Sequence, residues 1–153
     1  MSRLQHFGLF AVILIAAFIE SACASKPIKG FVSEGLPLYP IKKVILLKHP
    51  RLYTDVGEAV QKELRDRGVE IIKVEDFYSD KQVKSDAADS AIWVSAVKAF
   101  DIGVHIGFME IRIYNAKTGE LLGTAKLERS SDGTDEAVHE LFDLIFSRIQ
   151  QPL

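Results

Sequence analysis

The amino-acid sequence predicts an α/β fold, with a single mixed sheet of about five strands and both helices on one face. Three observations carry this prediction. Apolar runs and helical patterns follow one another in the order β-α-β-β-β-β-α, each helical pattern has one apolar stripe, and a glycine-containing turn joins two strands. A sheet that receives both helices on the same face is the simplest way to bury two single stripes.

The first half of the domain predicts a strand, a helix and a second strand. Residues 43–48 hold four consecutive apolar side chains between lysines, which is typical of a buried central strand. The helix is expected to start at Thr54 or Asp55, either of which can cap it, and to end at Gly68. Residues 69–74 form the next strand, and this spacing predicts a parallel crossover.

The second half predicts a loop and three further strands. Residues 76–89 are polar and are expected to form the loop. Residues 91–100 are rich in β-forming side chains, although their alanines leave a helix open as the alternative. Residues 104–114 and 120–128 are expected to pair as a hairpin, with a tight turn at Gly119, where a positive φ is suitable.

The last helix is expected to be capped by Thr134 and to bury one apolar face. That face is formed by Val138, Leu141, Phe142, Ile145, Phe146 and Ile149. Alternation along the strand 104–114 defines two sheet faces. The more apolar one, which should meet the helices, carries His105, Met109, Ile111 and Ile113. The other, solvent-side face carries Ile106, Phe108, Glu110, Arg112 and Tyr114.

The N-terminus has the layout of an export signal. Arg3 supplies a positive charge, residues 7–19 form an uncharged, largely apolar run, and small residues surround Cys23. The run has thirteen residues, whereas a helix that spans a bilayer needs about 20. We therefore expect a signal peptide at 1–22, a Pro- and Gly-rich tether at 23–40, and a single periplasmic α/β domain at 41–153.

Two cleavage sites compete around the only cysteine of the chain. Ser21-Ala22-Cys23 resembles the lipobox of bacterial lipoproteins, in which the cysteine becomes the lipidated N-terminus, although Glu20 stands where that motif usually has Leu. The alternative is ordinary cleavage after Ala24, which satisfies the small-x-small pattern and would leave a soluble, cysteine-free periplasmic protein. Lipidation is the favoured reading, and with Ala24 after the cysteine the resemblance implies palmitate on Cys23 and the outer membrane.

Composition excludes several classes of function. The net charge is −2 and no run of basic residues occurs, so the sequence gives no electrostatic footprint for nucleic acid. One cysteine excludes an internal disulfide framework. His139-Glu140 begins like the zinc-protease helix motif, but Asp143 stands where the second histidine belongs. We predict no catalytic residue, metal or cofactor.

The remaining signals indicate an interaction surface. Gly103, Gly107 and Gly123 lie in or beside the hairpin, where glycine indicates a bulge or a close approach of another backbone. Aromatic side chains on a sheet face left open by the helices would form a docking site. The candidates for partner binding are Phe108, Tyr114 and Trp93.

The order of elements, together with Ala91-Ile92-Trp93 and Phe100-Asp101-Ile102 before the hairpin, resembles small bacterial cell-envelope lipoproteins with a periplasmic α/β domain. The amino-terminal domain of TolB is of a similar type. The resemblance implies a lipid-anchored accessory protein that binds another envelope protein without catalysis. The alternative is a soluble periplasmic ligand-binding or enzymatic domain with a site at the end of the first strand, near His49, where open α/β sheets often place ligands.

Overall fold

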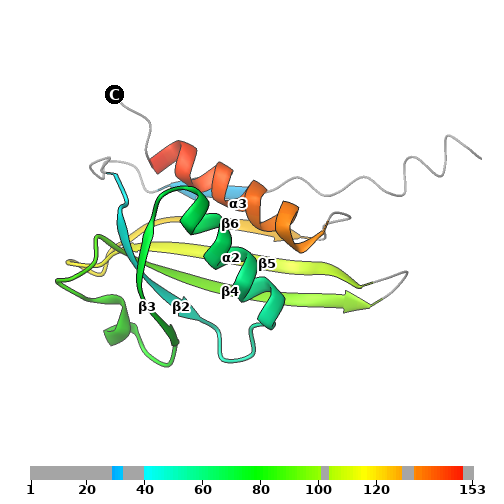
Figure 1. The fold of residues 1–153 in the computed structure, drawn as a ribbon, viewed down its shortest axis with the longest axis horizontal. Coiled ribbons are helices and arrows are strands. Elements are labelled where there is room, and N and C mark those ends of the chain that lie inside the picture. Colours follow the sequence, from blue (N-terminus) through cyan, green and yellow to red (C-terminus); the bar gives the residue numbers. More distant parts are fainter. Residues whose placement is uncertain (1–28, 33–39, 101–103, 129–132, 150–153) are drawn as a thin grey trace, which may run out of the picture.

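The computed structural model describes residues 29–32, 40–100, 104–128 and 133–149, which form one sheet with two helices packed on it (Figure 1). The elements are β1 (Lys29–Val32), β2 (Lys43–Lys48), α2 (Thr54–Asp66), β3 (Glu70–Asp76), the short 3-10 helix η1 (Asp80–Val83), β4 (Ser90–Phe100), β5 (Val104–Asn115), β6 (Leu121–Glu128) and α3 (Thr134–Ile149). The predicted order β-α-β-β-β-β-α is confirmed for residues 43–149. Residues 91–100 belong to a strand, and the expected loop contains η1.

The sheet is mixed, with the strand order β1-β6-β5-β4-β2-β3. β2 pairs in parallel with both β3 and β4, as the predicted crossover requires, whereas β4, β5, β6 and β1 pair antiparallel. β1 adds an edge strand inside the stretch expected to be a tether, with Phe31 opposite Thr124. The predicted signal peptide, Cys23 and the rest of the tether lie outside the described residues.

Both helices lie side by side across one face of the sheet (Figure 1), which confirms the predicted arrangement. The core between the layers is apolar because each helix contributes one stripe. Its members include Val56, Val60 and Leu64 from α2, Leu141, Phe142 and Ile145 from α3, and Ile111 and Ile113 from β5, all at most 1% exposed. The side chain of Ile149, expected in the same stripe, lies outside the described residues.

Arg67, directly after α2, joins the two helices. Its guanidinium contacts Glu63 at 2.6 Å and Asp143 of α3 at 2.5 Å. It also lies over the rings of Phe142 and Phe146, with centroid distances of 6.0 and 5.5 Å. A stacked guanidinium covers apolar surface while its charge stays paired, so Arg67 closes the end of the core between α2 and α3.

The predicted N-cap of α2, Thr54 or Asp55, is wrong. The N-cap of α2 is Tyr53, which makes no side-chain cap hydrogen bond. The Asp55 carboxylate instead accepts hydrogen bonds from Lys98 at 2.6 Å and from the Thr134 hydroxyl at 3.2 Å. These longer-range partners tie the start of α2 to β4 and to α3, which outweighs a local cap. The positive φ expected at Gly68 is confirmed at 74°.

Two of these carboxylates predict a loss of stability in acid. Lys98 lowers the pKa of Asp55 and Arg67 lowers the pKa of Asp143, in each case mainly through a side-chain hydrogen bond. Because a depressed pKa favours the folded state, their stabilisation is present above the ordinary value of 3.8 and disappears as the pH falls through the lowered pKa. We expect the free energy of unfolding, measured with urea, to fall less steeply below that pH in Asp143→Asn than in the parent protein. An unchanged slope would contradict the assignment.

A bulge at Gly107 reverses the alternation along β5. Phe108 pairs with Val97 and Ile106 pairs with Lys98, so Gly107 has no counterpart on β4. A Cβ on Gly107 would lie 3.0 Å from the Cβ of Ala99. The predicted bulge is therefore confirmed here, and the close approach leaves little room for a side chain at this position.

Because of the bulge, two residues lie on the sheet faces opposite to those predicted. Ile106 is 1% exposed in the core beneath the helices, not on the solvent-side face with Phe108. His105 pairs with Ala99, one step along, and so lies on the face away from the helices instead of among the helix-side residues. Gly123 adjoins a second register shift, after Ile113. Gly103 lies outside the described residues.

Candidate docking face of the sheet

Among the described residues, the sheet face turned away from the helices is covered by other elements at one end only. There β2 and the segment around η1 bury a second, smaller apolar cluster. Its buried members are Ile45, Leu47, Val83, Ala88, Ala91 and Ala116, with Phe77, Trp93 and Tyr114 packed against it. The same sheet face continues beyond this cluster along the middle of β4, β5 and β6. The term open face is used here for a set of side chains on these three strands: Trp93, Val97, Phe108, Glu110, Arg112, Tyr114 and Lys126.

The register places the three predicted partner-binding residues on the open face, with Trp93 and Tyr114 near one end and Phe108 toward the other. Trp93 lies opposite Arg112, Tyr114 opposite Ala91, and Phe108 opposite Val97. All three aromatic side chains are half-buried. Trp93 and Tyr114 pack on the smaller cluster. Phe108 lies toward the other end, beside a Val97 side chain that is 56% exposed.

A buried carboxylate organises the centre of the open face. The Glu110 side chain is 8% exposed, and its Oε1 accepts a hydrogen bond from Arg112 Nε at 2.7 Å. Lys126 Nζ lies 3.5 Å from the same oxygen. Glu110 and the Tyr114 hydroxyl raise the pKa of Arg112, with Glu110 the larger cause. One carboxylate thus pairs with two cations on a sheet surface, and its hydrogen bond orients the Arg112 side chain.

Trp93 is the most constrained aromatic of the open face. The Arg112 guanidinium lies over its ring at 4.7 Å, and Phe77 meets it edge-on with centroids 6.4 Å apart. Its indole Nε1 is buried and has no hydrogen-bond partner among the described residues. An indole N–H normally finds a partner when buried. Arg112 stacked on Trp93 therefore forms a rigid, amphipathic platform with one unused donor.

Sequence reasoning placed Glu110 and Arg112 on this face but missed Val97, Lys126 and the ion pairs that join Glu110 to Arg112 and Lys126. Alternation along β4, in which Trp93, Ser95 and Val97 share a side, was a signal for Val97. The ion pair with Lys126 depends on cross-strand register, because Lys126 pairs opposite Glu110 from another strand. Register on β6 could not be read from its own residues.

His49, near which the alternative hypothesis places a ligand or catalytic site, follows the end of β2 and is exposed. Its N–H donates to the Val94 carbonyl at 2.9 Å, and its Nδ1 accepts from the backbone of Arg51 at 3.2 Å. Neither pocket described below is lined by His49. The geometry gives this histidine a role in the turn after β2.

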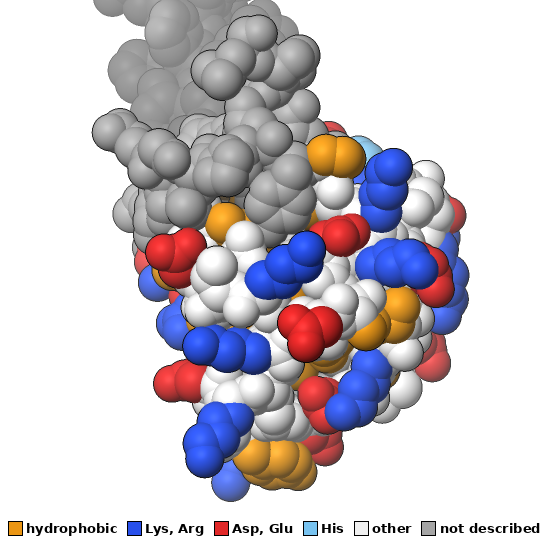
Figure 2. Space-filling model, turned by 90° about the vertical axis from the view of Figure 1, so that its left-hand side faces the viewer, with side chains coloured by type: hydrophobic (Ala, Val, Ile, Leu, Met, Phe, Trp, Pro, Cys, Tyr) orange, Lys and Arg blue, Asp and Glu red, His pale blue; other side chains and the backbone are white. Residues whose placement is uncertain are grey.

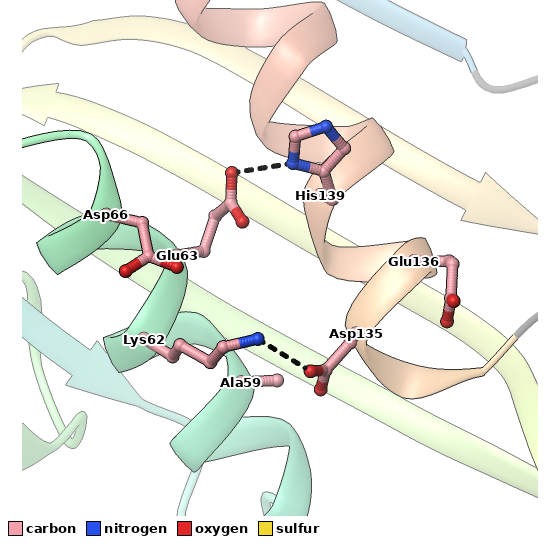
Figure 3. Close-up of a pocket in the computed structure, with 7 residues that line it drawn as sticks. All are labelled: Ala59, Lys62, Glu63, Asp66, Asp135, Glu136 and His139. Carbon is pink, nitrogen blue, oxygen red and sulfur yellow. Dashed lines mark hydrogen bonds and ion pairs between the residues drawn. The ribbon is translucent and has the colours of Figure 1, made fainter.

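His139 lies in a polar groove between α2 and α3 (Figure 3), where ion pairs cross from one helix to the other. Its Nδ1 contacts Glu63 at 3.0 Å and its Nε2 contacts Asp143 at 3.3 Å. Lys62 bridges to Asp135 at 3.0 Å in the same groove. The Asp143 contact stays within α3, whereas the Glu63–His139 and Lys62–Asp135 pairs join α2 to α3, so the groove is built mainly of interhelical ion pairs. Within the described ranges, no group of three His, Cys, Asp or Glu is placed to hold a metal ion.

No helix among the described residues is long and apolar enough to span a bilayer. Figure 2 views the molecule from one side and shows basic and acidic side chains interspersed over the visible surface, with small hydrophobic areas between them. Such mixing gives no single-sign field on this side.

Comparison with known proteins identifies relatives of the fold only. No family model and no curated protein sequence matches the chain. A variant of PelC from Paraburkholderia phytofirmans, solved as a dodecamer, has a TM-score of 0.53 at 12% identity, covering 82% of this chain and 99% of PelC. A second PelC dodecamer gives 0.51 at 12% identity, with coverage of 83% and 99%. A minor lipoprotein from Acinetobacter baumannii gives 0.27 at 12% identity, covering 75% and 88%. The resemblance to TolB stays a prediction, and the chain shares its fold with PelC.

Proposed function

We propose that the protein is a lipid-anchored, non-catalytic accessory protein of the bacterial cell envelope. It is exported, held in the outer membrane by lipid on Cys23, and faces the periplasm. Its open face binds another envelope protein. The observation that carries this proposal is that the exposed Val97 and the half-buried Phe108 lie on the same sheet face as the platform of Arg112 stacked on Trp93.

The composition of the open face supports docking. Interfaces are enriched in Trp, Tyr, Phe and Arg, and the residues that contribute most to affinity are anchored at the centre of the contact. Here Arg112 is already stacked and paired before a partner arrives, so little side-chain entropy remains to be lost. The exposed valine and the half-buried phenylalanine beside it supply apolar area.

The position of β1 supports a short connection to the membrane. β1 begins at Lys29, six residues after Cys23. Six residues reach at most about 20 Å when extended. A lipid on Cys23 would therefore keep the β1 edge of the sheet close to the bilayer, and the open face would be presented near that surface.

The solved PelC structures are dodecamers, which makes a second copy of this chain one candidate partner for the open face. Self-assembly and binding of another envelope protein use the same surface in this proposal. The mass of a crosslinked product separates them, because a multiple of the chain mass indicates copies of itself.

The test is a crosslinking pull-down from cells that carry single variants of the open face, compared with a valine variant elsewhere on the sheet. Val97→Glu or Phe108→Ser should abolish capture, since an interface anchor contributes about 2 kcal/mol or more. Val74→Glu is the matched control. Val74 is also an exposed strand valine, 39% exposed against 56% for Val97, but it lies opposite Leu46 on the helix side of the sheet. Tyr114→Ser should also lose capture.

His49→Ala should leave capture unchanged, because His49 follows β2 and is not part of the open face. Loss of capture in His49→Ala, with harmless changes at Phe108 and Tyr114, would reject docking in favour of the ligand-site alternative.

A further inference from the structure

A second pocket lies between the edge strand β3 and the segment around η1, away from the centre of the open face. Its volume is about 440 Å³, within the range of small-molecule sites. It is lined by Ile45, Ile72, Lys73, Glu75, Lys81, Gln82, Lys84, Ser85 and Ala87. Ile45 is buried and Ile72 half-buried, whereas the three lysines are exposed. The pocket therefore has an aliphatic floor and a cationic rim.

Two of the three rim lysines carry unneutralised charge. Lys73 pairs with Glu75 at 2.6 Å. Lys81 and Lys84 form no ion pair with another described residue. The lining thus holds three cations and one anion, although the sequence contains no basic run. The fold gathers the lysines because η1 and the residues after it lie against β3.

The backbone that carries Lys81 and Lys84 is fixed. Gln82, between them, accepts hydrogen bonds from the N–H groups of Tyr78 at 2.6 Å and Ser79 at 3.0 Å. Its Nε2 donates to the carbonyl of Asp76 at the end of β3. The Ser85 N–H donates to the Ala116 carbonyl at 2.7 Å. These bonds hold both lysines at the rim before any ligand binds.

Gly119 keeps room for the Lys84 side chain. A Cβ on Gly119 would lie 2.9 Å from Lys84 Cε. The glycine has a φ of 81°, so the turn that joins β5 to β6 selects it for conformation as well. The side chain of Lys84 passes over this turn with its stem against the backbone.

We propose that this pocket binds the headgroup of an anionic phospholipid. The phosphate pairs with Lys81 and Lys84, and the adjoining apolar part of the lipid contacts Ile45 and Ile72. None of the described residues that line the pocket is aromatic, whereas nucleobase ligands are usually stacked on an aromatic ring. The aliphatic floor suits the apolar part of an amphiphilic anion, and the ammonium groups of Lys81 and Lys84 suit its charged part. The inference concerns a different surface from the proposed docking face and stands independently of it.

Vesicle flotation tests this inference with a purified chain that begins at residue 23 and carries Cys23→Ser, so that no acyl anchor contributes. The chain should float with vesicles that contain phosphatidylglycerol and not with phosphatidylcholine vesicles. Lys81→Gln with Lys84→Gln should weaken the partitioning about tenfold to thirtyfold, because each lysine near an anionic surface contributes about 1 kcal/mol. Thermal unfolding of each variant checks that the fold is intact.

Lys62→Gln with Arg65→Gln on α2 makes the same change of charge elsewhere and should alter partitioning less than twofold. Equal losses in the two double variants, or no flotation of the parent chain, would overturn the assignment. Glycerol phosphate should compete weakly. If it displaces the chain fully and binds Lys81 and Lys84 by itself, the site is one for soluble phosphates and the lipid assignment is wrong.

Discussion

Replacing Phe142 by Ala is expected to lower the free energy of unfolding by about 3–5 kcal/mol. The side chain is fully buried, tilted against Phe146 at 5.5 Å between centroids, and covered by the Arg67 guanidinium. Truncation leaves a cavity between α3 and the sheet that neighbouring side chains fill only in part. Since small domains are stable by about 5–15 kcal/mol, this one change removes a large share.

Urea unfolding followed by circular dichroism measures the loss. Tyr78→Ala is the control, because that ring is 75% exposed and its removal should change stability by about 0.5 kcal/mol or less. A Phe142→Ala midpoint equal to that of the parent would contradict the packing of α3 on the sheet.

Replacing Cys23 by Ser is expected to move the protein from the membrane fraction to the soluble periplasmic fraction. Several acyl chains hold a lipoprotein firmly, since each buried CH₂ contributes about 0.8 kcal/mol and a single chain is marginal. In the variant, Ala22 and Ala24 still flank the substituted position and satisfy the small-x-small pattern, so ordinary cleavage after Ala24 remains open to it. Cell fractionation with immunoblotting gives the distribution.

Intact mass of the mature parent protein controls this experiment. An acylated N-terminal Cys23 supports the anchor, and its absence from a chain that begins at Ser25 supports the soluble alternative. If the Cys23→Ser protein fractionates like the parent after its signal has been removed, another feature holds the protein at the membrane.

The fold was predictable because its elements have strong local signals. The apolar stripe of α3 and the four apolar residues of β2 identify their elements without knowledge of neighbours. Gly68, after α2, and Gly119, in the turn between β5 and β6, both have the positive φ that was expected. The local signal of β1 is weaker, since Lys29–Val32 has no alternation and its strand conformation depends on pairing with β6 at the edge of the sheet.

The details of the site were less predictable because they depend on register. The bulge at Gly107 moves Ile106 to the opposite face, and strict alternation cannot show at which residue the reversal occurs. The pairing of Glu110 with Lys126, and the gathering of Lys73, Lys81 and Lys84, bring together residues far apart in the chain or on different elements. A sequence without basic runs still folds into a locally cationic pocket.

Site-specific photocrosslinking in intact cells tests the open face as the working surface most directly. A photoreactive residue at Val97 or Phe108 should give a discrete crosslinked product, whose mass shows whether the partner is another envelope protein or a second copy. The same residue at Glu58 on α2 or Glu140 on α3, both exposed on the helix side, should give none. Products from the helix positions alone would contradict docking through the open face.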